Sequence, residues 1–256
     1  MPGAPVPAAV PTMTLSHILR EDPELAEAIP LSQRDRAAEE CVAATRSVRR
    51  GRWQPDDEAG GWVEPGGIGL LVLEGLLVRR VGVDDRFGAE LLGEGDLLRP
   101  WQGEDADPTL SRTTGWRVLE ATRVAVLDGA VAATMAAYPQ LTGRLVARAL
   151  ERSRNLAINM AIIHQSRVNT RLLMLLWHLA DRWGRVRTEG VMLPLHLTHS
   201  VLADLVAARR PTVTSSLSEL TRNGLVTPRD RGWLLHGDPP GELLQIQPVN
   251  VASSPG

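Results

Sequence analysis

The chain has 256 residues, of which 43% are hydrophobic, and a formal net charge of −2. This length accommodates two small domains, or one of moderate size, each with its own buried core. No window of 18 uncharged apolar residues occurs, so no transmembrane helix is predicted. Cys41 is the single cysteine, which excludes an internal disulfide and the thiolate set of an iron–sulfur cluster. We therefore expect a cytoplasmic protein.

The charge is unevenly distributed. All 28 basic residues are arginine, so a phosphate contact must come from a guanidinium group, a hydroxyl or the backbone. Residues 1–166 hold 18 arginines and 23 acidic residues, a balance of −5, whereas residues 167–256 hold 10 and 7, a balance of +3. The basic excess predicts that any nucleic-acid contact lies in the C-terminal third.

The N-terminal part begins with Pro- and Ala-rich residues 1–13, which lack the pattern of a secretory signal and are predicted to be a disordered leader. Residues 15–29 predict a helix with a break near Pro23. Residues 41–128 contain short β-rich runs separated by Gly, Pro and Asp, which are typical of a small all-β roll or barrel.

Two segments of this β-rich part have local signals. The apolar run 68–83 predicts a hairpin that turns at Glu74-Gly75. The acidic, polar tract 102–114 is interrupted by Pro108 and predicts a mobile loop.

A long helix is predicted from Pro139 to about Gln165. Positions at alternating spacings of four and three form a coiled-coil seam: Leu145, Ala149, Arg152, Leu156, Asn159 and Ile163. A second apolar edge carries Val146, Leu150 and Met160. Two edges predict that the helix packs on its own domain and on a second copy of the chain; the alternative is an ordinary core helix.

An apolar helix is predicted at 171–183, ended by Gly184, and two strand-like pieces follow within 185–197. Residues 198–226 then predict two short amphipathic helices joined by a tight turn. Thr198 suits the N-cap of the first helix and Pro211 the first turn of the second. The predicted buried faces consist of Leu202, Leu205, Val206, Val213, Leu217 and Leu220.

The second of these helices has a polar outer face that carries Thr212, Thr214, Ser215, Ser218 and Arg222. This layout is typical of a helix-turn-helix, whose second helix enters the DNA major groove. The segment 225–235 predicts a strand, a turn over Pro228 to Gly232, and a second strand, with Arg229 and Arg231 near the tip. The motif is therefore predicted to be winged.

Residues 193–236 resemble the DNA-binding domain of the Crp/Fnr family of bacterial transcription regulators, through the pattern LPL…LADLV…RPTV…L…L…GLV. The order of the other elements resembles that family over about residues 15–237. The resemblance implies an α+β fold: an N-terminal β-roll (a double-stranded β-helix like a cyclic-nucleotide-binding domain), a long dimerisation helix and a C-terminal winged helix-turn-helix. The expected domains are a leader at 1–13, a β-roll sensor domain with an N-terminal helix at 14–130, a linker and dimerisation helix at 131–166, the winged helix-turn-helix at 167–238 and a flexible tail at 239–256.

The resemblance also implies a function. We expect a homodimer that binds a palindromic operator in double-stranded DNA with the helix 211–223, has RNA polymerase as a further partner and binds no membrane. Carried over residue by residue, the base-reading positions are Arg210, Pro211, Thr212, Thr214, Ser215 and Ser218. The phosphate-contacting positions are Thr198, His199, Ser200, Arg209, Arg222, Arg229 and Arg231.

Some of these positions depart from the family pattern. Pro211 replaces a glutamate of the cyclic-AMP receptor protein and Ser215 replaces a common arginine, so the operator is expected to differ. Arg209 replaces a serine found in many relatives, so the second helix lacks a good cap. Arg210 is the expected principal reader, through a bidentate contact to guanine.

The family's nucleotide-binding members carry a phosphate cassette whose Gly-Glu-Leu/Met-Ser/Ala core is absent from this chain. Acidic residues stand where a phosphate would approach, which favours another effector or none, with a cyclic-nucleotide-responsive regulator as the alternative. The candidate effector pocket comprises Glu94, Arg99, Trp101, Arg112 and Thr113. The tryptophans of this half (Trp53, Trp62, Trp101 and Trp116) are expected in the core, or alternatively around an apolar effector.

No catalytic or metal-binding pattern is present, so we expect neither an enzyme nor a metal site, and no cofactor is identified. The rival hypothesis from another class is a protein-interaction module whose helix-turn-helix only packs. The polar face of the second helix favours DNA, because a packing helix would be apolar there.

Overall fold

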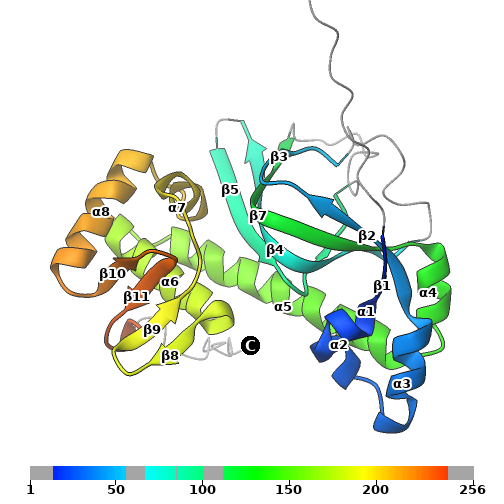
Figure 1. Cartoon of the computed structure of the whole chain (residues 1–256). Coiled ribbons are helices and arrows are strands. Elements are labelled where there is room, and N and C mark those ends of the chain that lie inside the picture. Colours follow the sequence, from blue (N-terminus) through cyan, green and yellow to red (C-terminus); the bar gives the residue numbers. More distant parts are fainter. Residues whose placement is uncertain (1–13, 56–66, 85, 101–111, 242–256) are drawn as a thin grey trace, which may run out of the picture. The chain divides into compact units, whose positions relative to one another are not determined.

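The computed structural model describes residues 14–55, 67–84, 86–100 and 112–241 (Figure 1). The chain divides into two compact units, and the boundary lies between Leu156 and Ala157. The first unit is rich in strands and the second in helices, so the expected α+β class is confirmed. No helix among the described residues is long and apolar enough to cross a membrane.

The chain enters the first unit as a strand rather than a helix. Pairing of Thr14–His17 with the strand that follows the helices overrides the helical pattern predicted over 15–29. The break at Pro23 is confirmed, because Asp22 accepts a hydrogen bond from the Leu25 amide at 2.9 Å and so begins a new helix. The elements are β1 (Thr14–His17), α1 (Ile18–Glu21), α2 (Pro23–Glu27) and α3 (Leu31–Glu40).

An antiparallel sheet of seven strands forms the body of this unit. Its order is β1-β2-β7-β4-β5, with β3 paired to β7 and β6 paired to β4. The further strands are β2 (Val42–Val48), β3 (Gly51–Trp53), β4 (Gly69–Val83), β5 (Arg86–Gly93), β6 (Leu97–Leu98) and β7 (Arg112–Leu127). Strands β4 and β7 pair along almost their whole length and form the centre of the sheet.

The hairpin turn predicted at Glu74-Gly75 is wrong. Strand β4 continues through these residues, and its pairing with β7 shifts register around them. Gly75 has φ +102°, and a Cβ there would lie 2.5 Å from the Thr122 hydroxyl and 2.6 Å from the Ala121 carbonyl oxygen. The glycine therefore marks a bulge rather than a turn. The chain reverses after Val83, which pairs with Arg86.

Two apolar clusters lie in the first unit. One contains residues of the N-terminal helices, β4, β7 and the following helices; the other includes Trp53 and Trp116. These two rings meet edge to face with centroids 5.7 Å apart, and both are buried, so the expected core role is confirmed for them. Trp62 and Trp101 lie outside the described residues, as do the predicted leader and most of the acidic tract 102–114.

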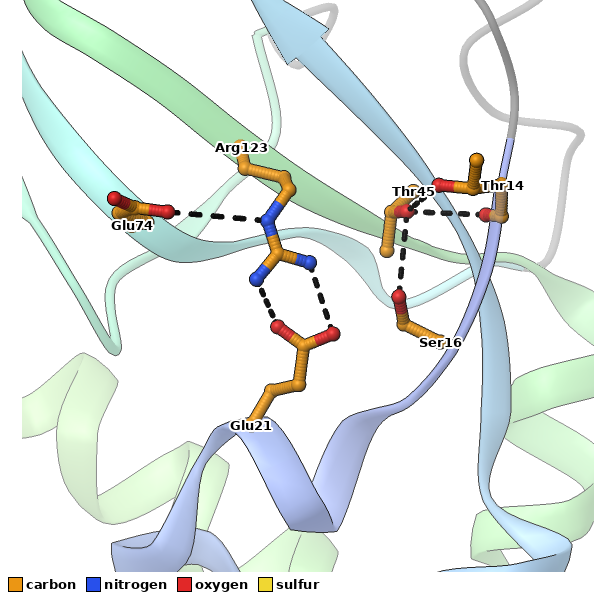
Figure 2. Close-up of polar contacts among 6 residues, drawn as sticks. All are labelled: Thr14, Ser16, Glu21, Thr45, Glu74 and Arg123. Atoms are coloured by element: carbon orange, nitrogen blue, oxygen red, sulfur yellow. Dashed lines mark hydrogen bonds and ion pairs between the residues drawn. The ribbon is translucent and has the colours of Figure 1, made fainter.

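Polar contacts attach β1 and α1 to the sheet (Figure 2). Arg123 on β7 binds the carboxylate of Glu21 with both terminal nitrogens, one of them at 2.9 Å, while Glu74 lies 4.0 Å from its Nε. The hydrogen bonds from Arg123 hold the pKa of Glu21 below its usual range. The Thr45 hydroxyl lies 2.8 Å from that of Thr14, which ties β2 to β1.

The long helix α5 (Pro139–Ile163) follows α4 (Gly129–Met135) and is bound to the first unit by arginines four residues apart. Arg148 contacts Asp22 at 2.5 Å, and Arg152 contacts Glu90 at 2.6 Å. Glu90 also pairs with Arg79 at 2.5 Å, so one buried carboxylate bridges two guanidinium groups. This face of α5 therefore packs on its own unit.

These contacts correct part of the predicted dimer seam. Leu145 lies in the apolar core of the first unit, and Arg152 is committed to Glu90, so neither side chain is available to a second copy. The outward edge, displaced by one residue, carries Val146, Leu150 and Met160, which are 53%, 63% and 60% exposed. Of the remaining predicted positions, Ala149 is exposed and Leu156, Asn159 and Ile163 are half-buried.

The second unit joins a three-helix group to a four-stranded antiparallel sheet of order β10-β11-β9-β8. The strands predicted within 185–197 are confirmed as β8 and β9. The elements are α6 (Val168–Trp183), β8 (Arg185–Arg187), β9 (Gly190–Leu193), α7 (His199–Leu205), α8 (Arg210–Arg222), β10 (Val226–Arg229) and β11 (Gly232–Leu235).

Candidate nucleic-acid interface

Helices α7 and α8 form the predicted helix-turn-helix. The Thr198 hydroxyl accepts a hydrogen bond from the Val201 amide at 3.3 Å and so caps α7 as expected. Between the helices Ala207 adopts a left-handed conformation, with φ +50°. The guanidinium group of Arg171, on α6, donates to the carbonyls of Val206 at 3.2 Å and Ala207 at 3.4 Å.

Arg171 is a positioning residue that sequence reasoning missed. Its Nε also donates to the Gln165 carbonyl at 2.6 Å, so one side chain fixes both the approach to α6 and the α7–α8 turn. The sequence gives little indication of this role, because an arginine near the start of an apolar helix is ordinarily exposed to solvent.

Helix α8 begins at Arg210, one residue before the predicted start, and ends at Arg222. Its N-cap residue, Arg209, makes no side-chain capping bond, as expected from its replacement of serine. The residues predicted to be buried on α7 and α8 are all buried. The predicted base-reading residues are all exposed, and all lie on α8: Arg210, Pro211, Thr212, Thr214, Ser215 and Ser218.

The hydroxyl groups on the outer face of α8 share one arrangement. Thr214 donates to the Arg210 carbonyl at 3.1 Å, Ser215 to the Pro211 carbonyl at 3.1 Å, and Ser218 to the Thr214 carbonyl at 3.0 Å. In each case the acceptor lies four residues earlier. These bonds fix the side-chain rotamers of the face.

A histidine joins the two helices. His199 Nδ1 on α7 lies 2.9 Å from the Thr214 hydroxyl oxygen on α8. Because the Thr214 hydrogen points to the Arg210 carbonyl, the ring nitrogen is the donor in this contact. Thr214 therefore has its hydrogen and one lone pair engaged within the protein.

The wing is confirmed as the hairpin β10–β11, with a tighter turn than predicted. Arg229 pairs with Gly232, so only Asp230 and Arg231 form the turn. The Arg229 guanidinium lies 3.3 Å from the carboxylate of Glu189, in the β8–β9 turn. His236 contacts Thr227 at 2.8 Å and the Glu189 carbonyl at 3.2 Å, which fixes the wing to that turn.

The predicted phosphate contacts lie around α7, α8 and the wing. Thr198, Ser200, Arg209, Arg222, Arg229 and Arg231 are exposed, and His199 is half-buried. The Thr198 hydroxyl is engaged in the cap, and Arg229 shares its charge with Glu189. Among the described residues, three of the predicted phosphate-contacting arginines are exposed and form no ion pair with an acidic side chain: Arg209, Arg222 and Arg231.

The residues of the candidate effector pocket lie at several places along the sheet, and the pocket stays a prediction. Arg99 lies beside Gly69, at the first residue of β4, whereas Arg112 pairs with Val83, at its last. Gly69 and Val83 are 14 residues apart along β4, whose pairing with β7 changes register between them. Glu94 lies at the β5–β6 turn, and Trp101 lies outside the described residues. The described residues contain no group of three or more His, Cys, Asp and Glu side chains that could hold a metal.

Comparison with known proteins gives matches for the second unit and for the fold. Residues 170–241 match the family model of the Crp-like helix-turn-helix domain. A curated relative from Porphyra purpurea, ycf28, provisionally described as an HTH-type transcriptional regulator, is 28% identical over 77 residues. That alignment covers 30% of this chain and 32% of the relative, about a third of its length.

Solved structures resemble the chain over most of its length. A CooA variant from Carboxydothermus hydrogenoformans matches with a TM-score of 0.59 at 14% identity, covering 87% of this chain and 90% of that chain. FixK2 from Bradyrhizobium japonicum matches with a TM-score of 0.54 at 17% identity, covering 76% and 93%. CprK complexed with OCPA matches with a TM-score of 0.52 at 12% identity, covering 90% and 94%. At these identities the likeness shows a common fold.

Proposed function

We propose that this chain is a homodimeric, sequence-specific DNA-binding transcription regulator of the Crp/Fnr type that places α8 in the major groove. The observation behind the proposal is the division of α8 into two faces. Val213, Leu217 and Leu220 are buried against the rest of the unit, while the opposite face exposes hydroxyl and guanidinium groups. A helix that only packed would not leave such a face to solvent.

Arg210 is the proposed principal base reader. It is exposed at the first residue of α8, the end of a recognition helix that approaches the base edges. Its forked guanidinium group matches the O6 and N7 acceptors of guanine. Arg209, Arg222 and the wing residue Arg231 are exposed and supply phosphate contacts that orient the helix.

Dimerisation is proposed to use the outward edge of α5. Val146, Leu150, Ser153, Ala157, Met160 and His164 follow one another at spacings of four and three, and all six are exposed. This is the repeat of a coiled-coil seam, with small residues at its centre that allow two helices to approach closely. A homodimer presents two recognition helices to a palindromic operator.

The regulator is proposed to act without cyclic AMP and to communicate with RNA polymerase once bound to DNA. Support for the first part is the missing phosphate cassette and the acidic residues in its place. Support for the second is the family itself, whose members are transcription regulators.

The DNA proposal is tested by selecting bound sequences from a random duplex pool and measuring affinities for the selected operator. Arg210→Ala is expected to lower specific affinity by about 1–3 kcal/mol and to relax preference at one base pair. Arg49→Ala removes the same charge from an exposed position in the first unit and serves as the control. If Arg210→Ala loses equal affinity for selected and for random DNA, base reading by Arg210 is excluded.

The dimer proposal is tested by sedimentation velocity. Leu150→Asp places a charge on the outward edge of α5 and is expected to yield monomers. Leu31→Asp alters an even more exposed leucine, on α3, and is expected to leave the dimer intact. A dimer that survives Leu150→Asp and Met160→Asp together would rule out this edge.

A further inference from the structure

The hydroxyl groups on α8 point to a specific class of base edge, an inference that rests on the proposed DNA-binding function. A serine or threonine hydroxyl has one hydrogen to donate and two lone pairs that accept. Ser215 and Ser218 each spend that hydrogen on the carbonyl four residues earlier, at 3.1 and 3.0 Å. What remains on the outer side of each oxygen is a lone pair.

We propose that Ser215 and Ser218 read DNA as hydrogen-bond acceptors, and therefore select bases that carry an exocyclic amino group in the major groove. Adenine N6 and cytosine N4 are the donors on that side of the base pairs. Guanine and thymine present only acceptors to a hydrogen-bonding partner there. Each serine thus favours adenine or cytosine on the strand that it faces.

Thr214 differs from its neighbours because His199 already donates to its oxygen. The Thr214 hydroxyl donates its hydrogen to the Arg210 carbonyl and accepts from His199, so only one lone pair is left for a further hydrogen bond. Thr214 is therefore a positioning residue that links α7 to the first turn of α8, rather than a base reader. It also holds the carbonyl of Arg210, the proposed guanine reader.

The chemistry of the face is then divided. Arg210 has only hydrogens to donate and suits guanine, whereas Ser215 and Ser218 accept and suit adenine or cytosine. An operator half-site is expected to contain a guanine together with one or two amino-bearing bases at neighbouring positions on the contacted strands.

The experiment uses the full-length protein and the operator selected from a random duplex pool. Selection is repeated with Ser215→Ala and Ser218→Ala, which occupy exposed helix positions where alanine is well tolerated. Each variant is expected to lose the preference for adenine or cytosine at one position. In the wild-type operator, that adenine is then replaced by purine, or that cytosine by 2-pyrimidinone, each of which lacks the amino group.

Removing the amino group is expected to weaken wild-type binding by about 2- to 12-fold, the effect of one hydrogen bond, and to leave the matching alanine variant unaffected. Thr214→Val is expected to weaken binding without altering any base preference, and Thr214→Ser to restore affinity. Thermal unfolding of each variant verifies that the fold is retained.

The outcomes separate the two proposals. If no sequence is enriched by the wild-type protein, the DNA-binding function fails and this inference fails with it. If an operator is found but the serine variants lose a preference for guanine or thymine, the hydroxyls donate and the inference alone is overturned. The same conclusion follows if the amino group contributes equally with and without the serine, or if Thr214→Val changes a base preference.

Discussion

The ion pair between Arg148 and Asp22 permits a quantitative prediction. Arg148 Nη1 lies 2.5 Å from Asp22 Oδ2, and the two side chains are only 9% and 7% exposed. Replacing Arg148 with Met retains much of the aliphatic packing and leaves the Asp22 carboxylate buried beside an apolar chain. Removing one partner of a buried pair costs about 3–5 kcal/mol.

Two features of the site lower that figure. Asp22 keeps its hydrogen bond from the Leu25 amide at 2.9 Å, which stabilises its charge. The second acidic partner of Arg148, Glu24, is largely solvated and contributes little. We therefore expect Arg148→Met to reduce the free energy of unfolding of the first unit by about 2–4 kcal/mol.

The assay is hydrogen–deuterium exchange of peptides from β1, β2 and β4, which reports the opening free energy of this unit separately from the other. Arg20→Met is the matched control, because the Arg20–Glu39 pair is exposed and should contribute only about 0–1 kcal/mol. Combining Arg148→Met with Asp22→Asn removes both charges while Asn still caps α2. The double variant should therefore lose less unfolding free energy than the sum of the losses of the two single variants. A cost for Arg148→Met no larger than that for Arg20→Met would refute the reasoning.

Three further predictions concern single positions in the first unit. Gly75→Ala should lower the free energy of unfolding in urea by about 1–3 kcal/mol or more, because the new Cβ meets backbone and Thr122 atoms at 2.5–2.6 Å. Gly88→Ala, with open space at its Cβ, should lower it far less. Equal losses of stability in the two variants would contradict the bulge. The Arg123 guanidinium lowers the pKa of Glu21, so this ion pair stabilises the folded state fully above pH 4.5 and stops doing so as the pH falls through the pKa of Glu21 in the folded protein. The free energy of unfolding, measured from pH 6 to 3, should therefore fall more steeply in the wild type than in Glu21→Gln. Parallel curves would exclude this linkage. Burial raises the pKa of Cys41 to about 11, so the native thiol should resist alkylation at pH 8 and react only on unfolding; rapid alkylation of folded protein would show that the site is open.

The helix-turn-helix could be predicted closely because its signals are local. Pro211 and the Asn223-Gly224 pair mark the ends of α8, and the observed helix starts one residue before the first and stops just before the second. Thr198 is both the expected and the observed cap of α7. Each of these positions interacts with residues within a few positions in the chain.

The first unit was harder to predict because its contacts are distant in sequence. Gly75 signals a special backbone conformation, but only its neighbour Thr122 on β7 makes that conformation a bulge rather than a turn. Likewise, the spacing on α5 allows two seams one residue apart. The choice between them depends on Glu90 and on the core around Leu145, which a repeat along the helix cannot reveal.

The candidate effector pocket stays a prediction, because its residues also depend on contacts that are distant in sequence. Arg99 and Arg112 are close in sequence, and a family cassette would bring such residues together. In the structure Arg99 lies beside Gly69, the first residue of β4, whereas Arg112 pairs with Val83, the last. Proximity along the chain is a poor guide in a sheet whose longest strands span 15 and 16 residues.

The arginines of α5 also bear on how the chain acquires its structure during synthesis. The Arg148–Asp22 pair joins residues 126 positions apart, and β2 finds its partner β7 only after some 80 residues have followed it. The N-terminal helices therefore emerge from the ribosome long before the residues that hold them. Closing such long loops is slow because their entropy is lost before the contacts form. We expect nascent chains that stop before α5 to leave α1 and α2 sensitive to protease, and chains that extend well beyond Arg152 to protect them.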